Sequence, residues 1–391
     1  MIGKWIALHG AYLATVAVST FIATPAFAQA TQVKLETLHS FDWTDGAYPS
    51  TPLVKGPDGR LYSVTGDGGI NITGSIFSVG RSGDFKLLYL FTGGADGAQG
   101  SSMWTHRGVI YGTTTMGGTN GAGTAFTVDP AGDLTTIHQC DGDCDQPGGP
   151  VVVSHGNFIG TSSFGGAWGS IYQLSPSGSM QVLYAFHNGS DEAEPNGAML
   201  ASDGNFYGTT MGWIGQNGTI WKLTPDGTFS TLYTFTGGAD GGEPRCPPVE
   251  APDGNLYGTA SQGGVNGNGV IYQLTPAGQF SVVYTFSGGT DGASPVAALI
   301  VGKDGALYGS TYRLGSGGAG TIFKFTTGGQ LTTIYSFSGS DGGYVEAPLL
   351  ETKAGTFFGV ASGGGEYSDG TVFKLKVKDA DSTSDTSADP E

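Results

Sequence analysis

Residues 251–295 read APDGNLYGTASQGGVNGNGVIYQLTPAGQFSVVYTFSGGTDGASP, and the rest of the chain repeats this pattern. Three landmarks recur: a Leu-Tyr-Gly-Thr run, a short apolar run that ends in an aromatic residue, and a Leu-Tyr-x-Phe ending. The third landmark ends in turn at Phe41, Phe91, Cys140, Phe186, Phe235, Phe286 and Phe337. Its period is close to 50 residues, and a fixed period of that size indicates a repeat architecture.

Each unit has the pattern of four antiparallel strands. In the fifth unit we expect strands over 247–251, 255–259, 270–275 and 279–286. The pair Asp253-Gly254 is a hairpin signal, because glycine accepts a positive φ without a Cβ clash. A single four-stranded sheet cannot bury both of its faces, whereas sheets stacked in a ring do so. The repeated aromatic residues are therefore expected to form the core between neighbouring sheets.

The two ends of the repeat array are incomplete, and each supplies what the other lacks. Residues 33–41 match the strand that ends every unit, and residues 345–378 hold the first three strands of a unit. The sequence therefore predicts an all-β fold: a seven-bladed β-propeller of four-stranded antiparallel blades, closed by the N-terminal strand, which completes the last blade. The expected blades are 49–91, 98–140, 149–186, 196–235, 245–286, 294–337, and 345–378 with 33–41.

The chain ends are expected to lie outside this single propeller domain of residues 29–378. Residues 1–28 have the features of a secretory signal peptide, with Lys4 near the start, an apolar run at 11–23 and Ala26-Phe27-Ala28 as the cleavage site. Cleavage after Ala28 would place the protein in the periplasm or outside the cell; a membrane anchor is the alternative interpretation. Residues 379–391 are acidic and hold no aromatic residue, which predicts a disordered tail.

The charge balance restricts the class of partner. The chain of 391 residues has a formal net charge of −17. This disfavours nucleic acid and anionic membranes, because phosphate binding needs a basic face. After the signal peptide no apolar run is long enough to span a bilayer, so we expect no membrane insertion after cleavage. The expected state is a monomer with a glycan or a peptide as ligand.

The run CDGDCD carries two further expectations. Cys140 and Cys144 favour a small disulfide in an oxidising setting, with Cys246 left over; three free thiols are the alternative. The same run holds three alternating carboxylates, at Asp141, Asp143 and Asp145. Carboxylates on a short loop suit a calcium ion, but the glycine and glutamate of a full calcium loop are missing, so a solvated turn also fits. No other cofactor is expected.

The units DGxLYGT, GGxxGxGxIY and LYxFxGxxDGxxP resemble the GloVer tandem repeat of secreted bacterial proteins. The resemblance covers residues 34–378 and rests on several motifs that recur together. It implies propeller-like repeats and no particular activity. Many members of the family add a C-terminal sorting anchor, and the acidic tail of this chain departs from that pattern.

In a four-stranded propeller, the blade-to-blade loops and the loops between second and third strands share one face. Here both sets are long and variable, so this loop-rich face is the expected binding face. By this strand assignment its basic residues are Arg245 and Arg313, and its histidine is His187. The aromatic departures from the repeat consensus, expected to contact a ligand, are Trp43, Trp168, Trp213 and Tyr367. The remaining departures include Asp191, Glu192, Glu194, Tyr312, Tyr344, Glu346 and Glu366.

Two functions fit this face. The first is a secreted module that binds a glycan or another extracellular ligand by stacking and hydrogen bonds. The alternative is a polysaccharide lyase for an anionic, uronate-containing polysaccharide, with His187 and Tyr312 as base and acid and Arg245 and Arg313 holding the carboxylate. A glycosidase would need two of the glutamates at a set separation. Ordinary loop variation with solvated charges fits the same residues.

Overall fold

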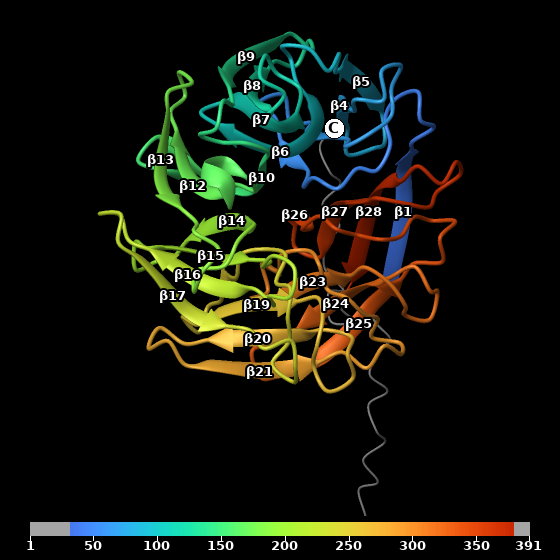
Figure 1. The fold of residues 1–391 in the computed structure, drawn as a ribbon. Coiled ribbons are helices and arrows are strands. Elements are labelled where there is room, and N and C mark those ends of the chain that lie inside the picture. The colour runs from blue at the N-terminus through green and yellow to red at the C-terminus, as the bar shows by residue number, and fades with distance from the viewer. Residues whose placement is uncertain (1–31, 379–391) are drawn as a thin grey trace, which may run out of the picture.

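The computed structural model describes residues 32–378. These residues form seven four-stranded antiparallel sheets, arranged in a ring as the blades of a propeller (Figure 1). This confirms the predicted fold class and blade number. The predicted signal peptide and acidic tail lie outside the described residues, so neither prediction is tested. Within residues 32–378, no helix is long and apolar enough to cross a membrane.

The first four blades follow chain order from inner to outer strand. Blades one and two are β2 (Val54–Lys55), β3 (Leu61–Val64), β4 (Ser75–Val79), β5 (Phe85–Leu90), then β6 (Ala98–His106), β7 (Val109–Met116), β8 (Thr124–Val128), β9 (Leu134–Gln139). Blades three and four are β10 (Pro147–Ser154), β11 (Asn157–Ser162), β12 (Ser170–Leu174), β13 (Met180–Ala185), then β14 (Pro195–Leu200), β15 (Phe206–Thr210), β16 (Thr219–Leu223), β17 (Phe229–Thr234). A short helix, η1 (Gly165–Ala167), lies between β11 and β12.

The last three blades complete the ring. Blades five and six are β18 (Val249–Glu250), β19 (Leu256–Ala260), β20 (Val270–Leu274), β21 (Phe280–Thr285), then β22 (Ile300–Val301), β23 (Leu307–Thr311), β24 (Thr321–Phe325), β25 (Leu331–Ser336). Blade seven combines β26 (Leu350–Lys353), β27 (Thr356–Ala361), β28 (Thr371–Lys378) and β1 (Gln32–Ser40).

The ring closes through the pairing of the first and last strands. Strand β1 lies antiparallel to β28, from Gln32 opposite Lys378 to Ser40 opposite Thr371, and the two strands stand side by side in blue and red in Figure 1. The predicted closure is therefore confirmed. It removes the free edge that β28 would otherwise present to solvent.

The hydrophobic core consists of seven clusters, and each joins the facing sheets of two adjacent blades. The third-strand aromatic residues that the repeats supply are all buried, at Phe77, Phe126, Tyr172, Trp221, Tyr272, Phe323 and Phe373. The glycine of the Leu-Tyr-Gly-Thr run makes room for them. A Cβ on Gly258 would overlap the Tyr272 ring, and one on Gly309 would lie 2.6 Å from Cζ of Phe323. The repeat therefore preserves a small residue where an aromatic ring crosses the neighbouring strand.

The repeated aspartate of the blade-to-blade loop binds the outer strand of the preceding blade. Asp291, for example, accepts hydrogen bonds from the Tyr284 hydroxyl (3.0 Å) and from the backbone N–H of Ser287 (2.7 Å). The equivalent pairs are Tyr89–Asp96, Tyr184–Asp191, Tyr233–Asp240, Tyr335–Asp341, His39–Asp45 and His138–Asp143. Thus each aspartate caps its turn and also ties that turn to the sheet.

Candidate binding site on the loop-rich face

Two residues of each blade-to-blade loop build the centre of the loop-rich face, and they flank the repeat proline or the residue in its place. The residue before it has a left-handed backbone in every blade, with φ between 51° and 58°, at Tyr48, Gln99, Gln146, Glu194, Glu243, Ser294 and Tyr344. Such a conformation is unfavourable for a residue with a Cβ and persists only where its surroundings fix it.

Backbone hydrogen bonds between blades fix this left-handed residue. The N–H of Glu243 donates to the carbonyl of Asn217 in blade four (2.8 Å), and its own carbonyl accepts from Ser261 N–H in blade five (3.2 Å). Ser294 and Tyr344 are held in the same way between their blades. The residues that surround the centre are therefore joined blade to blade, which makes this part of the face a rigid frame for side chains.

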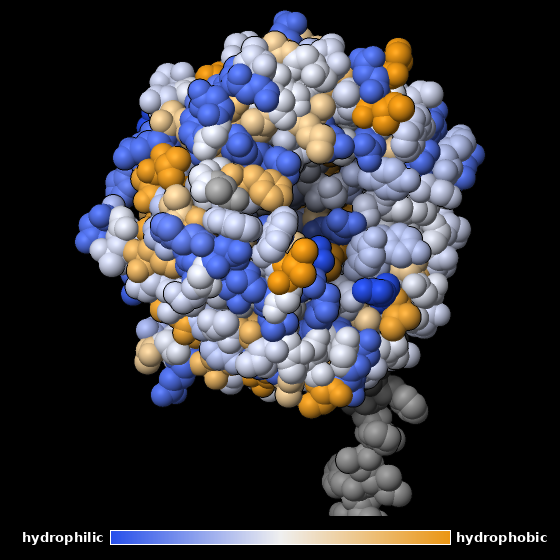
Figure 2. All heavy atoms as spheres, in the orientation of Figure 1, coloured by the Kyte–Doolittle hydropathy of each residue, from blue (hydrophilic) through white to orange (hydrophobic). Residues whose placement is uncertain are grey.

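The residue after the repeat proline points toward the ring axis and lines a central cavity of about 580 Å³. In six blades the residue at this position lines the cavity: Ser50, Ser101, Asn196, Arg245, Val296 and Glu346. Blade three contributes Gly149, which lies one residue later. Figure 2, which views the loop-rich face, shows the surface hollowed near its centre. A cavity of this volume is in the usual range for small-ligand sites.

Arg245 and Arg313 both line this central cavity. Arg245 forms an ion pair with Glu243 at 2.9 Å, and its side chain is 44% exposed. Arg313 is exposed, and its Nε donates to the hydroxyl of Ser294 at 3.1 Å. Within residues 32–378, Arg313 makes no ion pair. The two cations that the sequence singled out on this face are thus brought to one cavity, and one of them has no carboxylate partner there.

Glu346 and Tyr312 line the same cavity as the two arginines. Burial raises the pKa of the Glu346 carboxyl, and this effect outweighs a hydrogen bond from Ser362 (2.9 Å) and the charge of Arg245. Burial, with the charge of Glu346, also raises the pKa of the Tyr312 hydroxyl. The Tyr312 ring lies 5.2 Å from the ring of Tyr344. The cavity therefore combines cations, aromatic surface and a carboxyl group that resists ionisation.

Two shallower cavities adjoin the central one. The first, about 290 Å³, is lined by Glu194, Trp213, Ile214 and Gln216 and shares Met211, Glu243 and Arg245 with the central cavity. The second, about 740 Å³, is lined by Tyr48, Asp67, Tyr344 and Ser362 and shares Ser50, Tyr312 and Glu346 with it. Because they share walls, the three cavities form one continuous depression.

The four aromatic residues predicted to contact a ligand occupy different places. Trp213 lines the smaller side cavity, and its ring lies 5.9 Å from that of Trp168. Trp43 packs edge-on against Tyr48, with ring centroids 6.1 Å apart, and Tyr48 lines the larger side cavity. Tyr367 is 54% exposed and lines none of the three cavities. The geometry thus associates three of the four with the depression.

His187 does not line the cavity that holds the two arginines and Tyr312, its expected partner in a base–acid pair. It lines none of the three cavities, its side chain is 74% exposed, and its Nδ1 lies 3.2 Å from Oδ2 of Asp191. It occupies the position of Ser287 in blade five, whose backbone N–H donates a hydrogen bond to Asp291 as that of His187 donates to Asp191. His187 therefore belongs to the repeated turn at the end of an outer strand, away from the ring axis.

The glutamates that were candidates for a glycosidase pair are also dispersed. Glu346 lines the central cavity, and Glu194 the smaller side cavity. Glu192 is 6% exposed, and burial raises its pKa although it accepts backbone hydrogen bonds from Gly218 and Asn217. Glu366 lines none of the three cavities.

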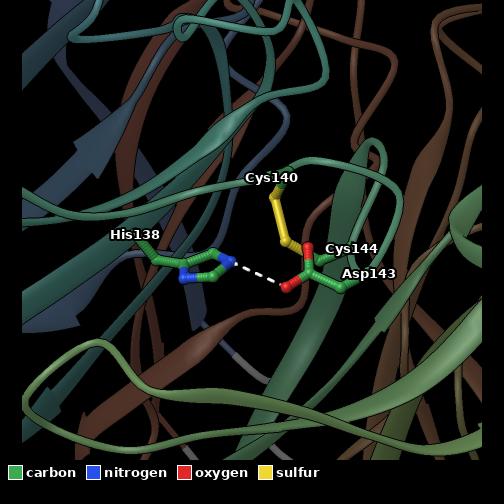
Figure 3. Close-up of side chains that lie close together, drawn as sticks. All are labelled: His138, Cys140, Asp143 and Cys144. Atoms are coloured by element: carbon green, nitrogen blue, oxygen red, sulfur yellow. Dashed lines mark hydrogen bonds and ion pairs between the residues drawn. A yellow bond between two sulfur atoms is a disulfide. The ribbon is translucent and has the colours of Figure 1, made fainter.

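Cys140 and Cys144 are joined in a disulfide with Cα atoms 5.2 Å apart (Figure 3). Cys246 is in no disulfide. Cys140 stands where the other outer strands end in phenylalanine, and both half-cystines are buried in the core between blades two and three. The disulfide fills the site of the missing aromatic ring. His138 binds Asp143 beside it (3.0 Å), in the place of the repeated Tyr–Asp pair.

The three aspartates of this run do not converge on one calcium site among the described residues. Asp143 belongs to a group with His138, Cys140 and Cys144 whose candidate ligand atoms lie within 4.8 Å of one another, but Asp141 and Asp145 do not. The two sulfurs are consumed in the disulfide. Asp145 instead accepts a hydrogen bond from the N–H of Gly142 (2.8 Å). The run forms a capped turn, which fits the alternative interpretation, and calcium binding by Asp141, Asp143 and Asp145 stays a prediction.

The sequence arguments missed Glu243 and Ser50, which line the central cavity, and Tyr48, which lines the larger side cavity. Each lies one residue from the repeat proline, as Arg245 does. The usable signal was therefore the offset from that proline and not the departure from consensus, because that offset sets which side chains reach the axis.

Comparisons with known proteins agree with this architecture. No curated protein matches the chain. Among solved structures it is similar to the extracellular domains of two proteins from B. thetaiotaomicron assigned to hybrid two-component systems, at 12% identity with a TM-score of 0.57 and at 14% with 0.54. These matches cover 88% and 84% of this chain, which spans 40% of the length of each of those structures.

A mutant puromycin hydrolase is similar at 12% identity with a TM-score of 0.56, over 82% of this chain and 51% of that one. At these identities the likeness concerns the fold alone. The family model of the Gloeobacter/Verrucomicrobia repeat matches residues 19–215 and 202–388, which is nearly the whole sequence. The chain therefore belongs to the Gloeobacter/Verrucomicrobia repeat family.

Proposed function

We propose that this protein is a secreted binding module that holds a uronate-containing glycan in the central cavity of its loop-rich face. The observation that carries the proposal is that Arg245 and Arg313 line one cavity. A chain of net charge −17 repels a carboxylate ligand in general, whereas a cavity lined by two arginines attracts one. Guanidinium groups bind carboxylates through charge-assisted hydrogen bonds of fixed geometry.

The other side chains of the depression suit a sugar. Tyr48, Tyr312, Tyr344 and Trp213 offer aromatic surface, and Ser50 and Asn196 offer hydrogen-bonding groups for hydroxyls. Stacking against an apolar ring face combined with a few placed polar contacts is the usual chemistry of such sites. The frame that carries these groups is fixed by hydrogen bonds between blades, so binding would cost little ordering of the protein.

Lyase chemistry has less support. Tyr312 and the two arginines share the cavity, but His187 lies elsewhere, and no histidine of residues 32–378 lines any of the three cavities. A proton taken from the carbon beside a uronate carboxylate needs a base within hydrogen-bond reach. The binding module is therefore the function that the geometry favours.

The test is a glycan-binding screen and calorimetry on the mature protein, with the double variant Arg245→Ala, Arg313→Ala. Because both arginines are partly exposed, each contact is taken at the low end, about 1.5 kcal/mol or roughly tenfold in affinity. The double variant should then bind at least tenfold more weakly. The matched control is Arg81→Ala, Arg107→Ala, which removes the same charge from exposed hairpin turns outside the loop-rich face.

Binding that survives the loss of Arg245 and Arg313, or a preference for neutral glycans, would contradict the proposal. Equal weakening in the control would assign the effect to net charge and not to the cavity. Capture of peptides in place of glycans would also contradict it. New ultraviolet absorbance from an unsaturated uronate product would favour the lyase instead.

A further inference from the structure

The geometry points to a groove that binds an internal stretch of a polysaccharide, with an acidic sugar at the centre and further sugar units on both sides. This inference rests on the proposed function and adds the size and polarity of the ligand. A pocket for a monosaccharide or a chain end would be closed on at least one side. The depression described above continues past the axis in two directions.

The continuity follows from the shared walls. Met211, Glu243 and Arg245 line both the central cavity and the smaller side cavity, so the two cavities meet at these residues. Ser50, Tyr312 and Glu346 do the same for the larger side cavity. The first set belongs to blades four and five and their connection, and the second to blades one, six and seven. The depression therefore crosses the ring from one side to the other through its axis.

Aromatic side chains stand at both ends of this groove. At one end Trp213 is 36% exposed and packs against Trp168 and Phe164. At the other end Tyr48 and Tyr344 are 45% and 38% exposed. Exposed rings at both ends are suited to stack on sugar units that leave the central cavity in opposite directions.

Charge is distributed unevenly along the groove. Both arginines line the central cavity, where Glu243 pairs with Arg245 and burial raises the pKa of Glu346. The side cavities add the carboxyl groups of Glu194 at one end and Asp67 at the other. An anionic group is favoured at the centre, and carboxylates at the ends accept hydrogen bonds from sugar hydroxyls but repel a second anion. The preferred ligand is therefore a chain in which an acidic unit lies between neutral ones.

The experiment is calorimetry on the mature protein with synthetic oligosaccharides of increasing length. A uronic acid monosaccharide is compared with a trisaccharide and a pentasaccharide that carry one central uronate between neutral sugars. We expect affinity to rise at least tenfold from monosaccharide to pentasaccharide. Trp213→Ala and Tyr48→Ala should each lower the pentasaccharide affinity several-fold, so that the ratio of pentasaccharide to monosaccharide affinity falls. Tyr367→Ala is the matched control, because its exposed ring on the same face lies outside the groove.

The stoichiometry on a long polysaccharide of the same repeating composition tests internal binding. More than two protein molecules per chain are expected, because a protein that binds chain ends would be limited to two. Equal affinity for the monosaccharide and the pentasaccharide, or an effect of Tyr367→Ala equal to that of Trp213→Ala, would overturn the groove. If binding did not depend on ligand length but still required Arg245 and Arg313, the proposed function would be supported and the groove would be refuted. Absence of binding by every uronate ligand would overturn both.

Discussion

Replacing Asp291 by alanine tests whether the repeated aspartate ties each turn to its sheet. Asp291 is 7% exposed and accepts hydrogen bonds from the Tyr284 hydroxyl, the Ser287 N–H and the Ser287 hydroxyl. Burial alone would raise the pKa of its carboxyl, but these hydrogen bonds outweigh burial and hold the pKa below the ordinary value of 3.8. The carboxylate is therefore stabilised in its charged form in the folded protein.

The expected loss follows from these contacts. A hydrogen bond to a charged group contributes about 1.5–3 kcal/mol, and the donors of Ser287 can turn to water in the variant. The Tyr284 contact and part of the Ser287 contacts are then lost, for a total of about 3 kcal/mol. With an unfolding entropy of about 2.1 cal/mol/K per residue, this lowers the melting temperature of a domain of this size by about 4 °C.

The assay is urea and thermal unfolding at neutral pH, with Asp133→Ala as the matched control. The Asp133 side chain is exposed in a hairpin turn and makes no hydrogen bond to any described residue, so its removal should change stability by less than about 0.5 kcal/mol. A lowered carboxyl pKa contributes stability above 3.8 that is lost as the pH falls through the folded-state pKa. The gap between wild type and Asp291→Ala should therefore close in acid. Equal stability of Asp291→Ala and the control at neutral pH would refute the reasoning.

Three further predictions concern closure, backbone strain and pH. Deleting residues 32–40 leaves the edge of β28 unpaired, so the truncated protein should aggregate in light scattering; a soluble monomer with unchanged melting would contradict closure at β1. Gln146→Gly relieves a left-handed backbone (φ 55°) and should raise the free energy of unfolding by about 0.5–1 kcal/mol in urea; a loss of stability would show that the conformation carries no strain. Because burial raises the pKa of Glu346 above 4.5, binding of a ligand that stays anionic should strengthen as the pH falls through that raised value, and Glu346→Gln should abolish the change; a pH dependence that persists in Glu346→Gln would contradict this assignment.

The same protonation of Glu346 bears on the fold. Since the raised pKa disfavours the charged form, the stability it contributes is complete below 4.5 and is lost as the pH rises through the folded-state value. Protonation of Glu346 as the pH falls should therefore increase both ligand affinity and the free energy of unfolding. Both pH effects should be absent in Glu346→Gln, which distinguishes them from effects of the aspartates.

Most of the fold was predictable because the repeat encodes it several times. Gly258 and Tyr272 recur together in equivalent positions, and the structure explains why: the ring crosses the glycine. The complementary half-units at the two ends predicted that residues 33–41 complete the last blade, and the structure pairs Gln32–Ser40 with Thr371–Lys378. These patterns are local and periodic, so they can be recognised in the sequence without any knowledge of tertiary contacts.

The candidate site was predictable only in part, because it depends on which side chains reach the ring axis. Arg245 lies one residue after the repeat proline and reaches the cavity, whereas His187 lies at the end of an outer strand and does not. Both were chosen for residue type and departure from the repeat. Glu243, which pairs with Arg245, was not predicted. Its left-handed backbone holds it beside the axis, and that conformation cannot be inferred from a glutamate in the sequence.

The most direct test of the account is a crystal structure of the mature protein with a trisaccharide that carries one central uronate. The account predicts that the sugar lies in the central cavity and that its carboxylate accepts hydrogen bonds from the guanidinium groups of Arg245 and Arg313. A saccharide bound on the opposite face, or one in the cavity with its carboxylate turned away from both arginines, would contradict it.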